Sequence, residues 1–306
     1  MQIPNLVEVF AHTFAVGICI CFNTMNPTRR YLERRNKVKE RKLEFVSYCL
    51  ILLITAVVIS IPSWAGEKDL ILHFDYEDFK GGEVVEKSQS KRNGKINGKV
   101  VQVDDGKFGK AGKFAAGSFL DLDGTTFPKD NIPTEAWSLL AWINVGAISD
   151  MAIFNARAKD NTWLIHPEAK GGGNYRWLLR AAGGSTIFDI RAGKNKANEW
   201  VHYAGIFSRE DKKATLYING SQVGEEKARL DGPVAGDWGS GARVGLNIDN
   251  QRPFTGLMDD LNIWKKALTQ DEIKAIMNDG VSAFLSVTAV EAQRKLATTW
   301  ANIKNR

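Results

Sequence analysis

The sequence predicts an all-β body built as a two-sheet sandwich or a barrel. From Leu70 onward, short apolar stretches alternate with clusters of Gly, Asn and Asp, a pattern typical of strands joined by tight turns. The segment 137–145 is apolar at both alternating positions, so its strand is covered on both faces or lies deep in a two-sheet core. Asn219 and Gly220 follow another apolar run and are a strong signal for a two-residue hairpin turn.

The individual strands can be assigned in order along the chain. The first is expected at 70–74 (LILHF), and a loop rich in Lys, Gly and Asn separates it from 98–103 (GKVVQV). The series continues with 137–145 (WSLLAWINV), 200–207 (WVHYAGIF) and 214–220 (ATLYING).

One helix is predicted near the end of the chain. Thr269 and Glu272 form a capping box before the run IKAIM, and Gly280 can terminate the helix. The remaining residues, 281–306, form a tail without a predicted function. Four of its apolar residues can line one side of a short helix: Val290, Leu296, Trp300 and Ile303.

Charge and cysteine content limit the function classes. The formal charge of +6 is concentrated in residues 1–65, which hold eight of the 41 basic and four of the 35 acidic residues, so the rest of the chain carries a net charge of only +2. A near-neutral body argues against nucleic acid as a partner. The body also has no cysteine, so its core must hold it together without disulfides, which fits a bacterial envelope protein better than a secreted eukaryotic one.

The N-terminal region has the pattern of a secretory signal. An uncharged apolar run, 45–61, follows a basic segment, and Ser63-Trp64-Ala65 supplies small residues for cleavage before Gly66. The basic segment is expected to stay cytoplasmic while the body is exported to the periplasm, the envelope or the medium. The alternative is a single-pass membrane anchor, for which 17 residues is the short limit.

The predicted organisation has four parts. Residues 1–44 form a basic cytoplasmic region, of which 1–24 precede Met25, an alternative start. Residues 45–65 form the signal peptide or anchor, residues 66–280 the β domain, and residues 281–306 the tail.

Four segments of the body resemble the laminin-G-like branch of the concanavalin A-like lectin/glucanase superfamily. They are LILHFDYED (70–78), VDDGKFGKAGKFAAGSFLDL (103–122), EWVHYAGIFSREDKKATLYINGSQVGE (199–225) and FTGLMDDLNIWKKALTQDEI (254–273). The resemblance implies a two-sheet antiparallel jelly-roll sandwich, in agreement with the strand pattern. Fold alone does not decide function.

The closing segment contains a candidate metal ligand. Strand alternation places Asp259 in a row with Leu257, Leu261 and Ile263, where an acid is costly to bury unless it is paired or bound to a metal. In the similar jelly rolls this aspartate helps to hold a structural calcium, and Asp75 would be the neighbouring acid. The alternative is that Asp259 accepts backbone N–H bonds without a metal.

A candidate ligand-binding patch lies on two strands joined by a glycine-rich turn and on the strand that follows. Alternation assigns one face of these strands to the core: Trp163, Ile165, Trp177, Leu179, Phe188 and Ile190. The opposite face carries a polar set that suits an acidic sugar or a carboxylate: His166, Arg180, Asp189 and Arg191. The alternative is an ordinary solvated surface.

Catalytic machinery is not evident. The related glucanases carry a Glu-x-Asp-x-Glu motif on one strand, and this sequence has none. Trp200 and His202 share a face with Ala204 and Ile206, so we expect them to belong to the core.

The sequence therefore predicts a non-catalytic, exported recognition module that binds carbohydrate, with one calcium ion as the only cofactor considered. The alternative is a structural or protein-adhesion module of the cell surface, and a hydrolase with an unrecognised site is the third hypothesis. Expected partners are a glycan or a cell-surface protein, with a membrane involved only through the N-terminal segment.

Overall fold

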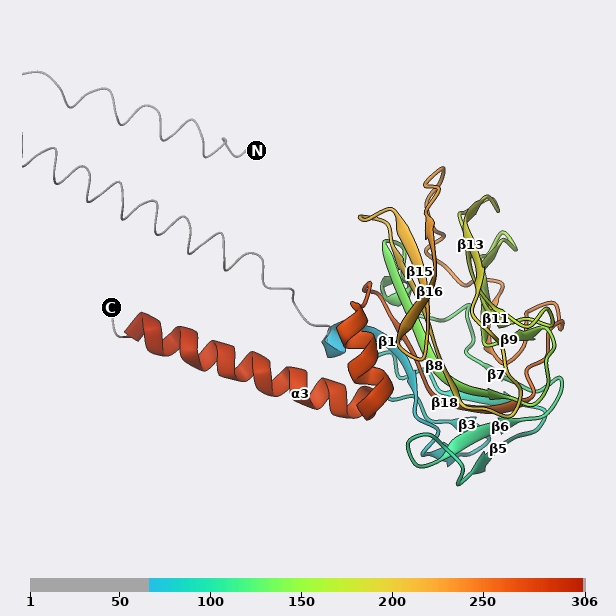
Figure 1. Cartoon of the computed structure of the whole chain (residues 1–306), viewed down its shortest axis with the longest axis horizontal. Helices are drawn as coiled ribbons and strands as arrows, with labels where there is room; N and C mark the ends of the chain where they lie inside the picture. The colour runs from blue at the N-terminus through green and yellow to red at the C-terminus, as the bar shows by residue number, and fades with distance from the viewer. Residues whose placement is uncertain (1–65, 305–306) are drawn as a thin grey trace, which may run out of the picture. The chain divides into compact units, whose positions relative to one another are not determined.

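Two antiparallel sheets face each other and enclose most of the apolar side chains. The computed structural model describes residues 66–304, with side chains as far as residue 288, so the signal, anchor and start site predicted within residues 1–65 lie outside the described residues. Figure 1 views the two layers edge-on, with β8, β15 and β16 in one layer and β11 and β13 in the other. The predicted two-sheet antiparallel sandwich is confirmed.

We call the layers sheet A and sheet B. Sheet A has the order β16-β15-β14-β8-β18-β6-β5, with β1 pairing to β18. Its strands are β1 (Leu70–Phe74), β5 (Val100–Val103), β6 (Ala111–Phe114), β8 (Ala136–Val145), β14 (Val201–Ser208), β15 (Lys213–Ile218), β16 (Ser221–Lys227) and β18 (Gly256–Trp264).

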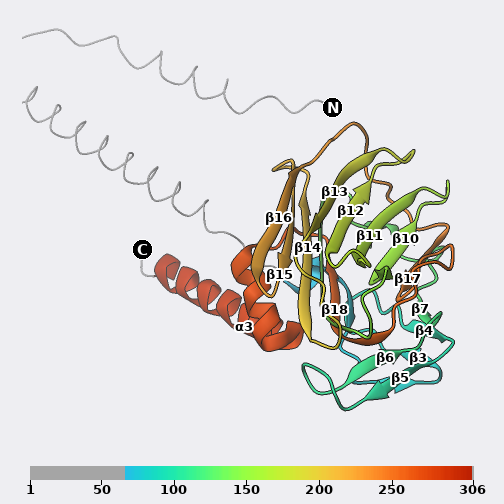
Figure 2. The ribbon, with the colours of Figure 1, turned by 45° about the vertical axis from the view of Figure 1, so that its right-hand side comes forward.

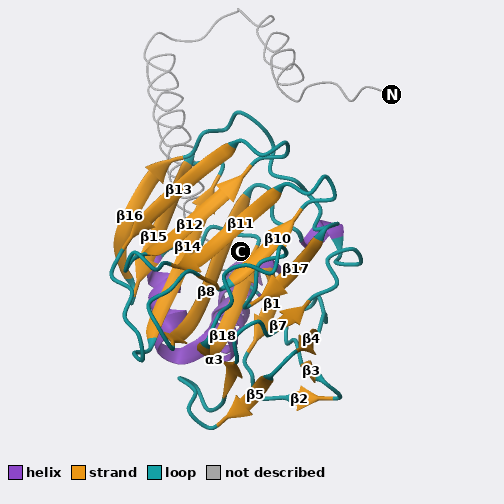
Figure 3. Ribbon diagram, turned by 90° about the vertical axis from the view of Figure 1, so that its right-hand side faces the viewer, coloured by secondary structure: helices purple, strands orange, loops and turns teal. Residues whose placement is uncertain are grey.

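Sheet B has the order β13-β12-β11-β10-β17-β7-β4-β3-β2, with β9 pairing to β11, and Figure 3 faces this sheet. Its strands are β2 (Phe79–Lys80), β3 (Glu83–Val84), β4 (Gly94–Asn97), β7 (Phe119–Asp121), β9 (Met151–Ala152), β10 (Phe154–Arg157), β11 (Trp163–Ala169), β12 (Tyr175–Arg180), β13 (Thr186–Ala192) and β17 (Gly241–Val244). Two short 3-10 turns are η1 (Glu67–Asp69) and η2 (Lys129–Asn131).

The central strand β8 has apolar side chains on both of its faces, and the packing of the two faces explains this. Trp137, Leu139 and Ala141 pack into the core between the sheets. Leu140 and Trp142 face the other way, where Leu140 joins a second apolar cluster with the helix α3 (Gln270–Lys304) and Trp142 lies beneath the Lys107 ammonium, 4.4 Å from the ring centroid. Both faces of this strand are therefore covered.

Local sequence signals define the hairpin and the helix. Asn219 and Gly220 have positive φ angles of 50° and 72° and connect β15 to β16, as expected for a two-residue turn. At the start of α3 the Glu272 carboxylate accepts from the Thr269 N–H (2.8 Å), and the Thr269 hydroxyl accepts from the Glu272 N–H (3.3 Å), which confirms the capping box. Gly280 (φ 78°) interrupts the helix, and a second helical segment follows it through the predicted tail.

The first segment of α3 and the start of the second cover part of the outer face of sheet A (Figure 2). Ile273, Ile276 and Phe284 pack with Leu140 of β8 and Trp264 of β18 in one buried cluster. Among the described residues, no helix combines the length and the apolarity needed to cross a membrane.

Candidate functional site

No helix of the described part of the chain covers the outer face of sheet B (Figure 3). Across β4, β7 and β17, Lys95 lies opposite Asp121, and Asp121 lies opposite Arg243. The row continues to Asn155 of β10, which is opposite Arg243 and contacts His166 of β11. Because residues opposite one another in adjacent strands share a face, these polar residues form one continuous surface.

Three of the four predicted patch residues lie on this face. His166 is opposite Leu178, and Leu178 is opposite Asp189, as the alternation required. The Arg191 guanidinium contacts the Asp189 carboxylate at 3.1 Å. Arg180 has no described contact with the other three, because the register shifts between Leu179 and Arg180, and its buried Nε has no hydrogen-bond partner in the described part of the chain.

The patch is held together by residues that the sequence analysis did not select. Glu168 is completely buried, and its carboxylate contacts His166 Nδ1 at 3.3 Å, Arg252 Nε at 3.2 Å and Arg176 Nη1 at 3.4 Å. Arg176 in turn binds both carboxylate oxygens of Asp189, at 2.6 and 2.8 Å. The expected polar side chains are therefore neutralised by one another. We call Glu168, Arg176, Asp189, Arg191 and Arg252 the ion-pair network.

The electrostatics follow from burial and from these pairs. Burial alone would raise the pKa of the Glu168 carboxyl, but His166, Arg252 and Lys170 hold that pKa below its usual value. Burial is also the main cause that lowers the pKa of His166, so its imidazole is neutral near pH 7. His166 is only 1% exposed, so it is not a free surface donor.

Trp163 was expected in the core, and this prediction is wrong. A register shift between Ala156 and Arg157 disturbs the alternation at this end of β11. The Trp163 ring instead stacks on His166 (4.9 Å between centroids) and lies under the Arg157 guanidinium at 4.2 Å. Since two side chains cover this half-buried ring, it offers a sugar little aromatic surface for stacking.

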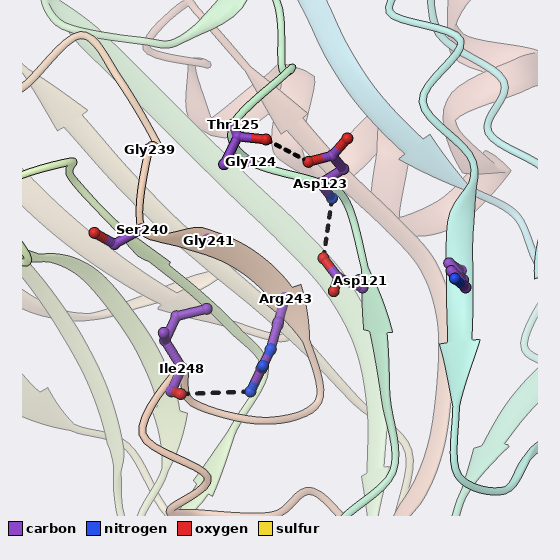
Figure 4. A pocket seen from close by; sticks show the side chains of 10 residues that line it. Asp121, Asp123, Gly124, Thr125, Gly239, Ser240, Gly241, Arg243 and Ile248 are labelled. Carbon is purple, nitrogen blue, oxygen red and sulfur yellow. Dashed lines mark hydrogen bonds between the residues drawn. The ribbon is translucent and has the colours of Figure 1, made fainter.

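A pocket of about 460 Å³ opens at the other half of the face, between β7 and β17 (Figure 4). This is within the usual size range of small-molecule sites. Its lining is formed by charged groups, hydroxyls and backbone, with a single apolar side chain: Lys95, Asp121, Asp123, Gly124, Thr125, Gly239, Ser240, Gly241, Arg243 and Ile248.

The walls of the pocket are two turns packed backbone to backbone. A Cβ atom on Gly124 would lie 2.3 Å from the Trp238 carbonyl oxygen, so only glycine permits this approach. Gly241 has φ 124°, which also favours glycine, and the neighbouring Leu122 N–H donates to the Ala242 carbonyl at 3.1 Å. The pocket is thus built from fixed main chain.

The charged groups of the pocket are also held in place. The Asp121 carboxylate accepts from the Asp123 N–H at 3.0 Å, and the Asp123 carboxylate accepts from the Thr125 hydroxyl at 2.6 Å. Arg243 stacks on Phe119 (4.1 Å) and donates through Nη1 to the Asn250 side chain at 3.0 Å. Figure 4 shows Asp121 and Arg243 on neighbouring strands at the pocket floor.

The two predicted calcium ligands have other partners. Asp259 is fully buried, and its carboxylate accepts three backbone N–H bonds, from Lys107 (2.8 Å), Phe108 (2.8 Å) and Asp260 (2.7 Å). Asp75 accepts from the Glu77 N–H and lies 3.8 Å from the Lys87 ammonium. Within residues 66–304, no group of three or more His, Cys, Asp or Glu residues is arranged to hold a metal ion. Calcium binding by Asp75 and Asp259 stays a prediction.

A β-bulge interrupts the apolar row in which the sequence analysis placed Asp259. Asp260 has φ 47°, and the pairing of β18 with β8 shifts between Asp259 and Asn262. Met258, Leu261 and Ile263 therefore face the core between the sheets, and Asp259 does not share an unbroken alternation with them. Two of its three N–H donors, those of Lys107 and Phe108, connect the segment at 103–110 to the closing strand.

Some site residues could have been found from the sequence. Glu168 and Arg176 have the same strand parity as His166 and Leu178, so extending the alternation by one step would have included them. Asp121, Arg243 and Arg252 carried no such signal, because their strands and loops are far apart in sequence and meet only through the sheet order.

A sequence model of the family described as the concanavalin A-like lectin/glucanases superfamily matches residues 121–274, slightly more than half of the chain. The segment includes the pocket residues of β7 and β17 and the whole ion-pair network. Pentraxin-related protein PTX3 of Homo sapiens is 21% identical over 160 residues, which cover 49% of this chain and 41% of that protein.

Several solved structures share the fold. The binding domain of Paraclostridial Mosquitocidal Protein 1 has a TM-score of 0.52 and 18% identity, covering 69% of this chain and 52% of that one. Domain 4 of AbnA, a GH43 extracellular arabinanase of Geobacillus stearothermophilus in complex with arabinotriose, has a TM-score of 0.51 and 21% identity, covering 68% and 98%. The receptor binding domain of botulinum neurotoxin C/D mosaic serotype has a TM-score of 0.51 and 20% identity, covering 69% and 51%. The chain thus spans about half the length of two of these structures and less than half of the pentraxin relative.

Proposed function

Because this chain belongs to the concanavalin A-like lectin/glucanase superfamily, we propose that it is a non-catalytic carbohydrate-binding module. The observation that carries the proposal is the pocket on the outer face of sheet B. It combines fixed main chain with carboxylate, hydroxyl and guanidinium groups, which are the partners that sugar hydroxyls require. Arabinotriose bound to the similar domain of the GH43 arabinanase supports the same ligand class.

We propose that the module is not catalytic because of the way its acidic side chains are arranged. Glycoside hydrolysis by the common mechanisms needs two carboxyl groups facing each other across a substrate. Asp121 and Asp123, the acids of the pocket, are engaged by a backbone N–H and by hydroxyls within one turn. Glu168 and Asp189 are neutralised by arginines. We therefore expect no hydrolysis of any glycan that the module binds.

The test is a glycan array probed with the full chain, with and without calcium. Binding to one set of related glycans, without release of reducing sugar after prolonged incubation, supports the proposal. Release of reducing sugar would assign an enzyme instead. If the chain binds none of the glycans, the proposed carbohydrate-binding function is wrong.

A protein-adhesion module is the second candidate, and the binding domain of the mosquitocidal protein and the receptor binding domain of the neurotoxin favour it. If the chain still captures a cell-surface protein after all glycans have been removed enzymatically, this candidate is supported.

We also propose that the chain is exported. Intact-mass analysis of the exported product should then show a mature chain that begins at Gly66. A full-length product in the membrane fraction would support the anchor.

A further inference from the structure

We infer that the pocket ligand is an uncharged sugar, recognised through its hydroxyl groups by Asp121 and Arg243. This inference rests on the proposed function and adds to it the site and the charge class of the ligand. It departs from the sequence-based expectation of an acidic sugar bound by His166 and the arginines.

The charges of the pocket favour a neutral ligand. Lys95 and Arg243 bring two positive charges, and Asp121 and Asp123 bring two negative charges, all on adjacent strands or turns. Because these charges balance, a carboxylate or sulfate on the ligand would gain no net attraction to offset its own desolvation. An uncharged sugar avoids this cost.

Three arginines outside the pocket, Arg176, Arg191 and Arg252, are already engaged. Arg176 and Arg191 share the Asp189 carboxylate, and Arg252 pairs with the buried Glu168. An acidic ligand would have to displace these internal partners and leave a buried carboxylate without its cations, which is unfavourable. The half of the face with the most arginine is therefore poorly suited to bind anions.

Hydrogen-bonding capacity remains inside the pocket. Among the described residues, Asp121 forms no ion pair, and one of its oxygens accepts only the Asp123 N–H. Arg243 uses Nη1 to hold the loop at 247–250, and no described residue accepts from its Nε or Nη2. The Asp121 carboxylate can accept from one sugar hydroxyl while the Arg243 guanidinium donates to another, so the pair can recognise adjacent hydroxyls.

The experiment measures binding of the full chain by calorimetry. The probes are three neutral trisaccharides, arabinotriose, cellotriose and maltotriose, and the acidic trigalacturonate. Asp121→Asn keeps the shape of the side chain and removes its charge. Asp189→Asn makes the same change on the same face outside the pocket and serves as the matched control. Hydrogen–deuterium exchange of the wild-type complex then reports which segment the sugar protects.

We expect a neutral trisaccharide to bind at least tenfold more tightly than trigalacturonate. Asp121→Asn should weaken this binding by at least tenfold, and Asp189→Asn by less than twofold. Protection from exchange should fall on residues 121–126 and 238–243. Affinity should change little between 50 and 500 mM NaCl, because no net charge is neutralised on binding.

Each other result overturns the inference in a distinct way. Preferential, salt-sensitive binding of trigalacturonate would overturn the charge class and leave carbohydrate binding intact. Neutral binding that withstands Asp121→Asn but is lost with Asp189→Asn would move the site to the ion-pair network. Binding that requires calcium would overturn direct recognition by these side chains. Failure of every probe in this assay, together with an empty glycan array, would remove the proposed function as well.

Discussion

The outer faces of the two sheets have opposite chemistry. Sheet A presents Leu140, Ala204, Ile206 and Trp264, and α3 covers them with apolar side chains from both sides of Gly280. Sheet B presents charged and polar residues, and a loop that carries Arg252 contacts the buried Glu168 on this face. The inner faces of both sheets share one apolar core.

This difference separates two tasks within one sandwich. Burial of apolar area on sheet A contributes to the stability of folding. On sheet B, buried charges cost desolvation that their ion pairs must offset, so that face contributes less stability but offers hydrogen-bonding groups at a surface. Mutations on sheet A should therefore change mainly stability, and mutations in the pocket of sheet B should change mainly binding.

The largest expected effect is on sheet A. Trp264 is fully buried, packs edge-on against Phe284 at 6.0 Å, and donates to the Asn262 side chain. Trp264→Ala should lower the free energy of unfolding by about 3–5 kcal/mol, measured by urea denaturation. Sugar affinity, measured at a temperature where the variant is folded, should not change. A parallel loss of affinity would show that the two faces are coupled.

The next effect concerns the buried charge of sheet B. Glu168→Gln removes the anion that faces His166, Arg176 and Arg252, and should lower the free energy of unfolding by about 2–3 kcal/mol. The matched control is Glu225→Gln, since Glu225 forms a solvent-exposed pair with Lys213 and should have almost no effect. Equal effects of the two substitutions would mean that the ion-pair network does not stabilise the fold.

A smaller effect is the pH dependence of sheet A, where two buried groups act in opposite directions. Burial lowers the pKa of His202 to about 3, so His202 contributes stability that is lost as the pH falls from about 6.5 towards 3. Burial raises the pKa of Asp259 to about 7, so this carboxyl contributes stability that is present below its unfolded pKa and lost as the pH rises towards 7.

These two contributions oppose each other between about pH 4 and 6.5, so they largely cancel in the wild type. His202→Gln removes one of them. The stability of this variant relative to that of the wild type, measured by urea denaturation, should rise as the pH falls from 7 to 4. A curve parallel to that of the wild type would contradict the assignment of the two buried groups.

The smallest expected effect is that of calcium. If Asp259 and Asp75 bind this ion, calcium added to chelated protein should raise its Tm, because the ion binds the folded state preferentially. The rise should be small, since three N–H donors already surround the Asp259 carboxylate, and it should vanish in Asp259→Asn. A Tm that is constant over a wide range of calcium concentrations would show that the protein does not bind calcium at these residues.

The elements of the fold were predicted from short-range patterns that the structure contains. The strand at 70–74 has those limits, Asn219-Gly220 forms the expected hairpin turn, and the Thr269–Glu272 capping box starts α3. Each of these signals acts over a few residues, so the local sequence suffices to specify it.

The errors come from bulges and from long-range assembly. A single extra residue at Asp260 or near Arg157 inverts the alternation, and nothing in the neighbouring side-chain types marks the position. For this reason Trp163 was assigned to the core and Asp259 to an apolar row. The pocket could not be predicted, because Asp121 and Arg243 become neighbours only once the order of the strands in sheet B is known.

The meeting of β1 with β18 has a mechanical consequence. The chain enters the sandwich at Gly66 and leaves it towards α3 at a common seam, where the Lys265 N–H donates to the Asp69 carbonyl at 2.8 Å and Leu70 pairs with Trp264. A tether attached at either end would therefore pull on sheet A. Tension between the two ends would peel β1 from β18, because the loaded ends of these antiparallel strands lie side by side. The turns that form the pocket belong to the other sheet and lie outside that force path. A sugar bound in the pocket would therefore contact a site that keeps its shape while the tether is under tension.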